Sequence, residues 1–197
     1  AATIGLDSSP RFLARAWQQA PRGVAFGEHD ITRVPFPAPP ADLIYGRFIV
    51  THLPDAGAAV ARWAEALAPR GRLALEEVDT MTSDDPTLVR YYALVEAMQA
   101  ERGQLTYVGR ELAALAPAEA FVVERADTVP VTLPASVAAR LHALNFRTWR
   151  KNPFIVASVA AEELARLGEA LEAIAAGARP AAPVRWKMAQ VVLRRRG

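Results

Sequence analysis

The first 78 residues alternate short apolar runs with amphipathic segments of helical spacing. The apolar runs cover residues 1–7, 24–29, 42–50 and 72–78, and each has the length of a buried strand. Ser9 and Pro10 are a cap and a first-turn proline for a helix whose apolar residues recur from Phe12 to Trp17. Asp55 caps an alanine-rich segment that we expect to be helical to about Ala68, and residues 69–71 form a turn. This alternation predicts right-handed crossovers and a parallel sheet.

After residue 78 the pattern changes to longer helical segments. Apolar spacing predicts helices over 86–102, 108–115, 135–150 and 160–176, and strands over 121–133 and 184–194. The segment 175–183 is too short for a linker between domains, so we expect a single domain over residues 1–197. The pattern therefore predicts an α/β fold with helices inserted between its late strands.

Composition narrows the classes of protein that fit. The 197 residues are 52% hydrophobic and 22% charged, which is enough apolar surface for a folded core. The absence of cysteine excludes disulfides and cysteine nucleophiles, and three scattered histidines do not predict a metal site. No apolar run approaches the roughly 20 residues of a membrane-spanning helix. The net charge is only +2, which does not predict a nucleic acid partner. We expect a cytoplasmic protein with no membrane partner.

Polar residues gather where three successive predicted strands end. Asp7 with Ser8 ends the first, Asp30 with Ile31 the second, and Tyr45-Gly46-Arg47 the third. Ligands of open parallel sheets bind outside the carboxyl ends of the strands, where a carboxylate accepts hydrogen bonds from the hydroxyls of a ribose. The alternatives are local: Asp7 is also a helix cap, and Asp30 is also a residue that ends a strand at a turn.

Taken together, these motifs resemble class I S-adenosylmethionine-dependent methyltransferases. The resemblance is carried by residues 4–10 (IGLDSSP), Asp30-Ile31 before Pro35-Phe36-Pro37, residues 42–45 (DLIY) before 52–55 (HLPD), and residues 67–73 (LAPRGRL). Residues 185–192 (RWKMAQVV) resemble the last, antiparallel strand of that fold. The resemblance extends over nearly the whole chain. It implies a three-layer, Rossmann-like fold. The sheet of this fold is mostly parallel with an antiparallel C-terminal strand, and cap helices are expected over about 86–116 and 134–176.

The resemblance also implies S-adenosyl-L-methionine as cofactor and assigns roles to the strand ends. Asp7, with Ser8 beside it, would bind the ribose hydroxyls, and Asp30 would bind the adenine amino group. Ile31 would pack on the adenine, and Arg47 would lie near the methionine moiety. The implied reaction is transfer of a methyl group to a small-molecule acceptor by in-line displacement.

Residues for catalysis and for the acceptor are weaker candidates. His52 is a possible base, although in the resembled motif it more often anchors a turn, and Glu77 is one of three acids (with Glu76 and Asp79) that end a strand. Tyr91, His142 and Trp149 are candidates for binding the acceptor. They belong to a larger aromatic set that also includes Tyr92, Phe154 and Trp186, and its alternative role is ordinary core.

One departure from the family pattern affects the cofactor site. The family's first strand and glycine-rich loop precede the segment that resembles residues 4–10, whereas this sequence opens at Ala1. We expect an upstream segment, and we expect the strand that ends in Asp7 to lack a neighbour on one side, since the family's first strand separates it from the strand that ends near Tyr45. Two other functions stay open: a non-catalytic, methyltransferase-like scaffold, and a nicotinamide-dependent oxidoreductase. A homodimer is possible.

Overall fold

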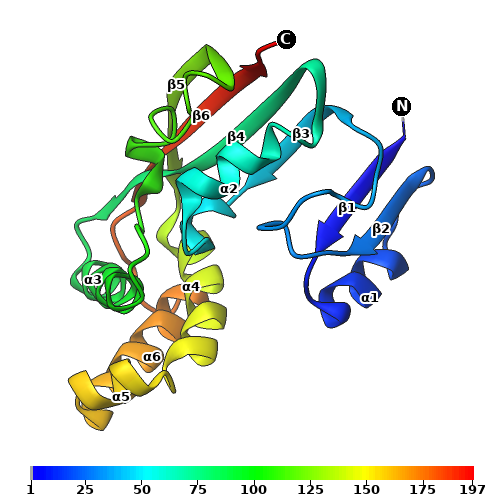
Figure 1. Ribbon diagram of the computed structural model, residues 1–197. Helices are drawn as coiled ribbons and strands as arrows, with labels where there is room; N and C mark the ends of the chain where they lie inside the picture. The colour runs from blue at the N-terminus through cyan, green and yellow to red at the C-terminus, as the bar shows by residue number, and fades with distance from the viewer. Residues whose placement is uncertain (1) are drawn as a thin grey trace. The chain divides into compact units, whose positions relative to one another are not determined.

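The computed structural model describes residues 2–197 and divides the chain into two compact units. Unit 1 comprises Ala1–Leu75, Glu111–Ala126 and Val191–Gly197, and unit 2 comprises Glu76–Arg110 and Asp127–Gln190. Three long strands, β4 (Leu67–Ser83), β5 (Phe121–Leu133) and β6 (Val184–Arg195), contribute residues to both units. The other helices and strands each belong to one unit (Figure 1).

Unit 1 begins with a strand–helix–strand crossover. It consists of β1 (Thr3–Asp7), α1 (Pro10–Gln18) and β2 (Val24–Glu28). The two strands are parallel, in a register that sets Asp7 opposite Glu28. The Ser9 hydroxyl caps α1 by accepting a hydrogen bond from the Phe12 N–H at 3.4 Å, as the sequence predicts. Trp17 of α1 packs edge-on against Phe26 of β2, with ring centroids 5.4 Å apart, and so fixes the helix on one face of the strand pair.

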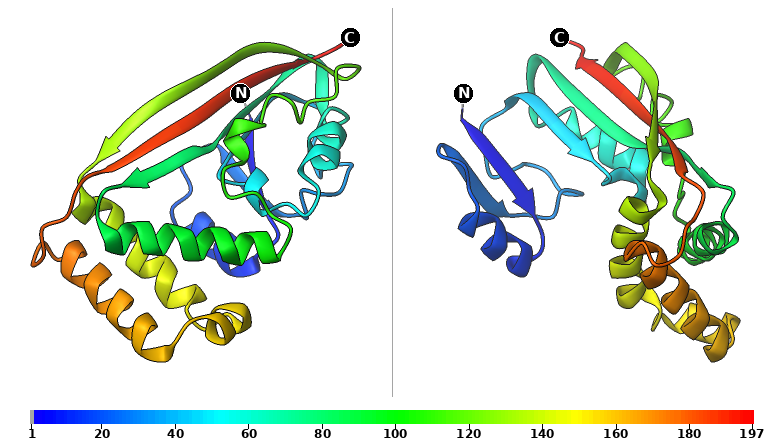
Figure 2. Two further views of the ribbon diagram at one scale, coloured as in Figure 1. Left: turned by 90° about the vertical axis from the view of Figure 1, so that its left-hand side faces the viewer. Right: turned by 180° about the vertical axis from the view of Figure 1, so that it is seen from behind.

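The rest of unit 1 builds on a second sheet. β3 (Ala41–Arg47) is followed by the short 3-10 helix η1 (Val50–His52), by α2 (Ala56–Trp63) with Asp55 as its cap, and by the start of β4. The strand order of this sheet is β3-β4-β6-β5. β6 runs opposite to β4 and β5 (Figure 2). The predicted α/β fold with a mixed sheet and an antiparallel C-terminal strand is confirmed.

β1 and β3 each have one unpaired edge among the described residues. β1 pairs with β2, and β3 ends the four-stranded sheet with β4 as its neighbour. Leu43 and Tyr45 of β3 are 58% and 61% exposed, although a strand inside a parallel sheet buries such side chains. The prediction that the strand ending in Asp7 lacks a neighbour on one side is confirmed for this part of the chain.

Unit 2 contains most of the helices. α3 (Pro86–Glu101), the 3-10 helix η2 (Val108–Arg110), α4 (Ala135–Trp149), α5 (Pro153–Ser158) and α6 (Ala161–Ala175) belong to it. Its apolar core comes from these helices and from the adjoining parts of the strands. The most buried members are Leu88, Ala139, Phe146, Ile155, Leu171, Ile174 and Val184. α4 packs against α6, and the buried alanines of α4 are part of this core.

Several predicted boundaries are wrong. The helix predicted over 108–115 is limited to η2 followed by turns, because Pro117 and the short apolar spacing do not sustain an α-helix. The helix after Asp55 ends at Trp63 rather than near Ala68. β4 is longer than predicted and includes the predicted turn at 69–71, where Arg70 has a φ of 64°. The third strand ends at Arg47, and the sequence analysis missed α5.

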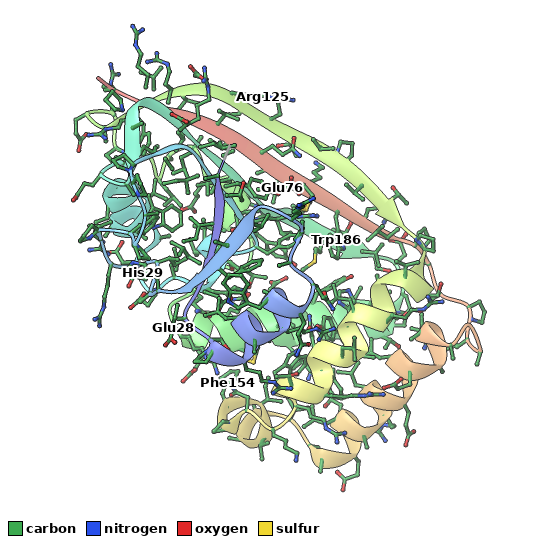
Figure 3. All side chains as sticks on the ribbon, turned by 90° about the vertical axis from the view of Figure 1, so that its right-hand side faces the viewer. Glu28, His29, Glu76, Arg125, Phe154 and Trp186 are labelled. Carbon is green, nitrogen blue, oxygen red and sulfur yellow. The ribbon has the colours of Figure 1, made fainter. Side chains whose placement is uncertain are left out.

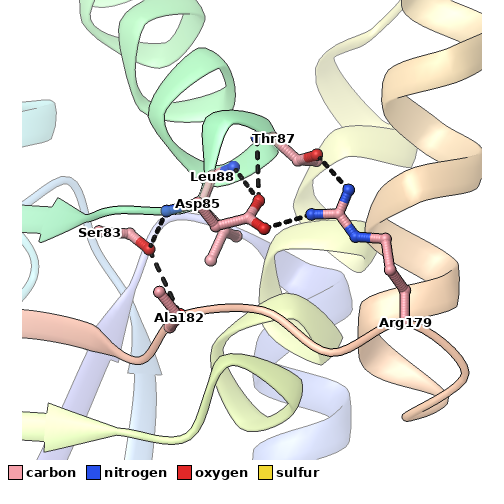
Figure 4. Close-up of polar contacts among 6 residues, drawn as sticks. All are labelled: Ser83, Asp85, Thr87, Leu88, Arg179 and Ala182. Atoms are coloured by element: carbon pink, nitrogen blue, oxygen red, sulfur yellow. Dashed lines mark hydrogen bonds and ion pairs between the residues drawn. The ribbon is translucent and has the colours of Figure 1, made fainter.

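A buried polar network joins the start of α3 to the loop after α6 (Figure 4). Asp85 caps α3 by accepting hydrogen bonds from the N–H groups of Thr87 at 2.9 Å and Leu88 at 3.3 Å. Its other carboxylate oxygen pairs with Arg179, whose guanidinium also donates to the Thr87 hydroxyl at 3.0 Å. Ser83 donates to the Ala182 carbonyl at 3.3 Å. The network therefore ties two segments of unit 2 that are about a hundred residues apart in sequence.

A second contact within unit 2, between η2 and β4, depends on a glycine. η2 lies directly against β4, and a Cβ atom on Gly109 would come within 2.6 Å of the Val78 carbonyl oxygen and 2.7 Å of the Asp79 nitrogen. Arg110 holds the contact by donating from Nε to the Asp79 carbonyl at 3.0 Å. Only a residue without a side chain permits this approach of two backbones.

Candidate functional site

An open cleft lies where β1 and β2 end. It has a volume of about 460 Å³ and is lined by Ser8, Glu28, His29, Asp30 and Arg33. Both strands run into it with their carboxyl ends, the end at which ligands of α/β proteins bind. Figure 3 labels Glu28 and His29 at the end of β2. Two predicted cofactor residues, Ser8 and Asp30, are therefore part of one cleft, and Asp7 immediately precedes Ser8.

Only one of the two oxygens of the Asp7 carboxylate accepts a hydrogen bond from the described residues. Its Oδ1 accepts a hydrogen bond from the Ser9 N–H at 2.7 Å, and its backbone carbonyl accepts one from the His29 N–H at 3.0 Å. Among the described residues, Oδ2 has no hydrogen-bond partner. The two alternatives for Asp7 are thus compatible: one oxygen shapes the turn into α1, and the other is available to a ligand hydroxyl.

Asp30 is more fully engaged by its own loop. Its Oδ1 accepts hydrogen bonds from the Thr32 N–H at 3.0 Å and the Thr32 hydroxyl at 2.7 Å, and its Oδ2 lies 3.2 Å from the Arg33 Nε. The hydrogen bonds from Thr32 hold the pKa of the Asp30 carboxyl below its usual range. Asp30 therefore stays ionised and rigid, with three of its acceptor positions already used.

Ile31 and Arg47 occupy well-defined places in unit 1. The Ile31 carbonyl accepts a hydrogen bond from the Trp63 indole N–H at 2.7 Å, which ties the loop after β2 to α2. Arg47, at the carboxyl end of β3, places its guanidinium 4.6 Å from the centre of the Phe48 ring. Phe48 has a φ of 54°, a left-handed conformation that costs energy for a residue with a side chain and that clusters at functional sites.

The two candidate catalytic residues lie in different units. His52 belongs to η1 in unit 1, and burial lowers the pKa of its imidazole below the ordinary value of 6.5. Glu77 of β4 lies in unit 2 and is 1% exposed. Neighbouring Glu76 accepts a hydrogen bond from the Gln190 amide at 2.9 Å. A catalytic role for either His52 or Glu77 stays a prediction.

The three candidate acceptor residues meet in the core of unit 2. Tyr91 stacks on His142 with ring centroids 4.5 Å apart and lies 5.5 Å from Trp149. The Tyr92 hydroxyl and His142 Nε2 share a hydrogen bond of 2.9 Å. His142 is only 3% exposed, and its Nδ1 has no hydrogen-bond partner among the described residues. The sequence analysis thus identified residues that lie together in space. Tyr91 and His142 are buried in the core, so an acceptor-binding role for the cluster stays a prediction.

Burial of His142 makes the stability of the protein depend on pH. Without a compensating charge, burial lowers the pKa of His142 to about 4 from an ordinary value of 6.5. Below pH 6.5 the unfolded chain binds a proton that the folded chain rejects, so stability falls as the pH falls toward 4. We expect a loss of about 2 kcal/mol between pH 7.5 and pH 4.5 in the free energy of urea unfolding.

The His142→Gln variant is the control for this pH dependence. It removes the titrating group and retains a polar side chain beside Tyr92, so it isolates the histidine from the carboxylates that also titrate in acid. The free energy of unfolding should fall less steeply between pH 7.5 and 4.5 in the variant than in the parent. Parallel slopes would show that His142 is protonated as readily in the folded chain as in the unfolded one.

The sequence analysis missed three residues that line the cleft, Glu28, His29 and Arg33. Glu28 and His29 follow from strand register, because the parallel pairing that sets Glu28 opposite Asp7 also carries His29 to the same edge. Arg33 lies in the loop after β2, where no strand register applies. Within residues 2–197, no helix has the length and apolar character needed to cross a bilayer.

Sequence comparisons identify relatives of the N-terminal part of the chain. A family model described as a methyltransferase domain matches residues 1–75. Trans-aconitate 2-methyltransferase of Methylobacterium nodulans is 38% identical over 93 residues, which is 47% of this chain and 35% of the relative. The enzyme of the same name from Methylobacterium radiotolerans is 36% identical over 119 residues, 60% of this chain and 45% of the relative. The chain thus spans less than half of the length of these curated relatives.

Structural comparisons cover the whole chain at low identity. A proposed methyltransferase of Bacillus halodurans C-125 aligns with all of this chain and 84% of its own, at a TM-score of 0.61 and 14% identity. The N-methyltransferase NodS of Bradyrhizobium japonicum WM9, solved with S-adenosyl-L-homocysteine, aligns with 98% of this chain and 66% of its own, at a TM-score of 0.51 and 14% identity. The cyclase SpnF aligns with 99% of this chain and 67% of its own, at a TM-score of 0.56 and 15% identity. These likenesses show a common fold.

Proposed function

We propose that this chain is part of an S-adenosylmethionine-dependent enzyme that methylates a small molecule. Residues 1–75 match the model of a methyltransferase domain, and the fold resembles that of solved methyltransferases. The cofactor would bind in the cleft at the carboxyl ends of β1 and β2. The observation that carries this proposal is the unengaged Oδ2 of Asp7 beside that cleft. It supplies the carboxylate acceptor that a ribose hydroxyl requires.

The cleft fits the adenosyl part of this cofactor in size and in chemistry. A volume of about 460 Å³ is within the range of small-molecule sites, and its polar lining offers several hydrogen-bond acceptors. S-Adenosylmethionine supplies an electrophilic methyl group on a sulfonium. Asp7 and the loop from His29 to Arg33 would hold the adenosyl end, and Arg47 is the candidate for the methionine end.

What the protein contributes to such a transfer is orientation. Holding donor and acceptor in line, in a site that excludes water, can contribute roughly 7–11 kcal/mol to lowering the barrier. A general base is needed only for acceptors that must lose a proton, and it adds about 10²–10⁴-fold. His52 and Glu77 are the candidates for that role.

For the acceptor, we infer a small organic acid as the first class to test. Both curated relatives are named as trans-aconitate 2-methyltransferases, and they match the N-terminal part of the chain. Fold alone does not select the reaction, because the cyclase SpnF has the same fold. The scaffold and oxidoreductase alternatives therefore have to be tested directly.

We also propose that polypeptide upstream of Ala1 completes the cofactor site. The unpaired edges of β1 and β3, and the exposed Leu43 and Tyr45, support an additional parallel strand between them. The family's glycine-rich loop would follow that strand and approach the methionine part of the cofactor. The 197-residue chain should then bind S-adenosylhomocysteine more weakly than the full-length protein.

Calorimetric titration of both forms tests the function. We expect S-adenosylhomocysteine to bind the full-length protein and NADH to give no heat. Binding of NADH in its place would support the oxidoreductase. Binding of neither ligand would support the scaffold. If the full-length protein methylates trans-aconitate, as radioactive methyl transfer would show, the acceptor class is established with the same preparation.

The Asp7→Ala variant of the full-length protein should bind S-adenosylhomocysteine about 10- to 100-fold more weakly. The reason is the loss of a charge-assisted hydrogen bond to a ribose hydroxyl, which contributes about 1.5–3 kcal/mol. Asp55→Ala is the matched control, because Asp55 caps α2 through the Ala58 N–H at 2.9 Å and lines no part of the cleft. Both variants lose a hydrogen bond from a backbone N–H to a carboxylate at the start of a helix. If both lose affinity equally, Asp7 acts through stability and not as a ligand.

A further inference from the structure

Three buried polar atoms without a partner belong to the aromatic cluster of unit 2. The cluster contains Tyr91 and Tyr92 of α3, His142 and Trp149 of α4, and Trp186 of β6. Among the described residues, six buried side-chain nitrogen or oxygen atoms have no hydrogen-bond partner. Three of the six are His142 Nδ1 and the indole nitrogens of Trp149 and Trp186. Buried polar groups are almost always hydrogen-bonded, so this concentration calls for a partner from outside the chain.

The rings of the cluster are in close contact. His142 stacks on Tyr91 and on Trp186, with ring centroids 4.5 Å and 6.3 Å apart. Burial raises the pKa of the Tyr91 and Tyr92 phenols, and the indole groups of Trp149 and Trp186 respectively oppose that rise. Each tyrosine hydroxyl therefore has an indole N–H near it, although neither N–H reaches hydrogen-bond geometry.

The unpartnered groups are matched to a ligand that accepts hydrogen bonds. An indole N–H can only donate. The Tyr92 hydroxyl and His142 Nε2 share a hydrogen bond of 2.9 Å. When the hydroxyl donates to Nε2, the proton of the neutral imidazole is on Nδ1, which is then a third donor. A carboxylate suits such a set, because its two oxygens only accept and its charge strengthens each hydrogen bond.

The cluster extends from the core to the surface of unit 2. Trp149 and Trp186 are partly exposed and pack against the buried core. Asn145, whose side chain lies near the Tyr91 hydroxyl, is exposed. The indole rings thus form the outer wall of the cluster, and a small ligand reaches the donors when one of these rings turns aside.

We propose that this cluster binds a carboxylate group of the methyl acceptor through the indole N–H groups of Trp149 and Trp186 and the Nδ1–H of His142. The assignment rests on the proposed function, since it takes the ligand to be an organic acid that the enzyme methylates. The acid would satisfy the three donors that the folded chain leaves without a partner.

The test measures two ligands by calorimetry on the full-length protein saturated with S-adenosylhomocysteine. The ligands are trans-aconitate and its trimethyl ester, which has no carboxylate, and we expect the parent to bind the acid more tightly. Trp149→Phe and Trp186→Phe each remove one donor and keep an aromatic ring. Each variant should bind trans-aconitate about tenfold more weakly, because a charge-assisted hydrogen bond is lost, and the ester less than threefold more weakly.

Trp17→Phe is the matched control, since Trp17 lies on α1 in unit 1, is 53% exposed and takes no part in the cluster. It should bind both ligands as the parent does. Unchanged affinities in Trp149→Phe and Trp186→Phe, or equal losses for acid and ester, would show that water or packing explains the cluster and would overturn the assignment. The same holds if the parent binds S-adenosylhomocysteine but no trans-aconitate. A parent that does not bind S-adenosylhomocysteine would overturn the proposed function as well.

Discussion

Asp85→Ala should lower the free energy of unfolding by about 2–4 kcal/mol, since it removes a helix cap and one partner of a sheltered ion pair. Asp85 has an 8% exposed side chain and serves both the N-terminus of α3 and the Arg179 guanidinium. Arg179 is 36% exposed, so solvent offsets part of the loss. Urea unfolding followed by circular dichroism measures the effect. We expect α3 and the loop after α6 to lose their amide protection first.

The adjacent residue is the control for Asp85. Asp84 pairs with Arg185 at 3.0 Å, but its side chain is 72% exposed, so Asp84→Ala should cost about 0–1 kcal/mol. The two variants differ by one position and remove the same charge. Equal losses of stability would mean that net charge, and not the buried network at the start of α3, explains the effect.

Gly109→Ala should destabilise the protein by about 2–3 kcal/mol because the added methyl group has no room. Its Cβ would meet the backbone of residues 78 and 79 of β4 at 2.6–2.7 Å, and neither backbone is free to move as a flexible side chain would. We expect η2 to leave β4 and the hydrogen bond from Arg110 to Asp79 to be lost. Thermal unfolding gives the stability, and hydrogen exchange over residues 105–112 shows the detachment.

Gly57→Ala is the matched control for Gly109. Gly57 lies in the first turn of α2, and the nearest atom to its added Cβ is an Asp55 carboxylate oxygen at 3.8 Å. Alanine is a better helix former, so this variant should be neutral or more stable by up to about 1 kcal/mol. A destabilised Gly57→Ala beside an unchanged Gly109→Ala would refute the steric explanation.

The sequence predicted the regular part of the fold because its signals are local. Ser9 with Pro10 starts α1, and the helices that begin at Pro86 and Ala135 have long apolar periodicity, so their positions agree with the prediction to within a residue or two. The strand over Phe121–Leu133 was predicted with its exact bounds. Boundaries failed where distant contacts decide them. β4 extends through Pro69 because it pairs with neighbours that no local pattern reveals.

The candidate site was predictable to a similar extent. Asp7 and Asp30 end strands that the apolar pattern identifies; Asp30 lines the cleft, and Asp7 directly precedes Ser8, which also lines it. The engagement of Asp30 by Thr32 and the orientation of His29 could not be predicted, since both depend on the folded path of a loop with little periodicity. The aromatic cluster was found from helical spacing, but spacing cannot distinguish a pocket from a packed core.

The unpaired edge of β3 affects how the 197-residue chain behaves in concentrated solution. Edge strands usually carry lysine, proline or inward charges that discourage other strands from pairing with them. β5, at the opposite end of the sheet, has Glu124, Arg125, Asp127 and Pro130. β3 reads ADLIYGR, with neither lysine nor proline, and its Leu43 and Tyr45 side chains are open to solvent. Self-association of the 197-residue chain should therefore start at β3, and a lysine at position 43 would raise its solubility limit.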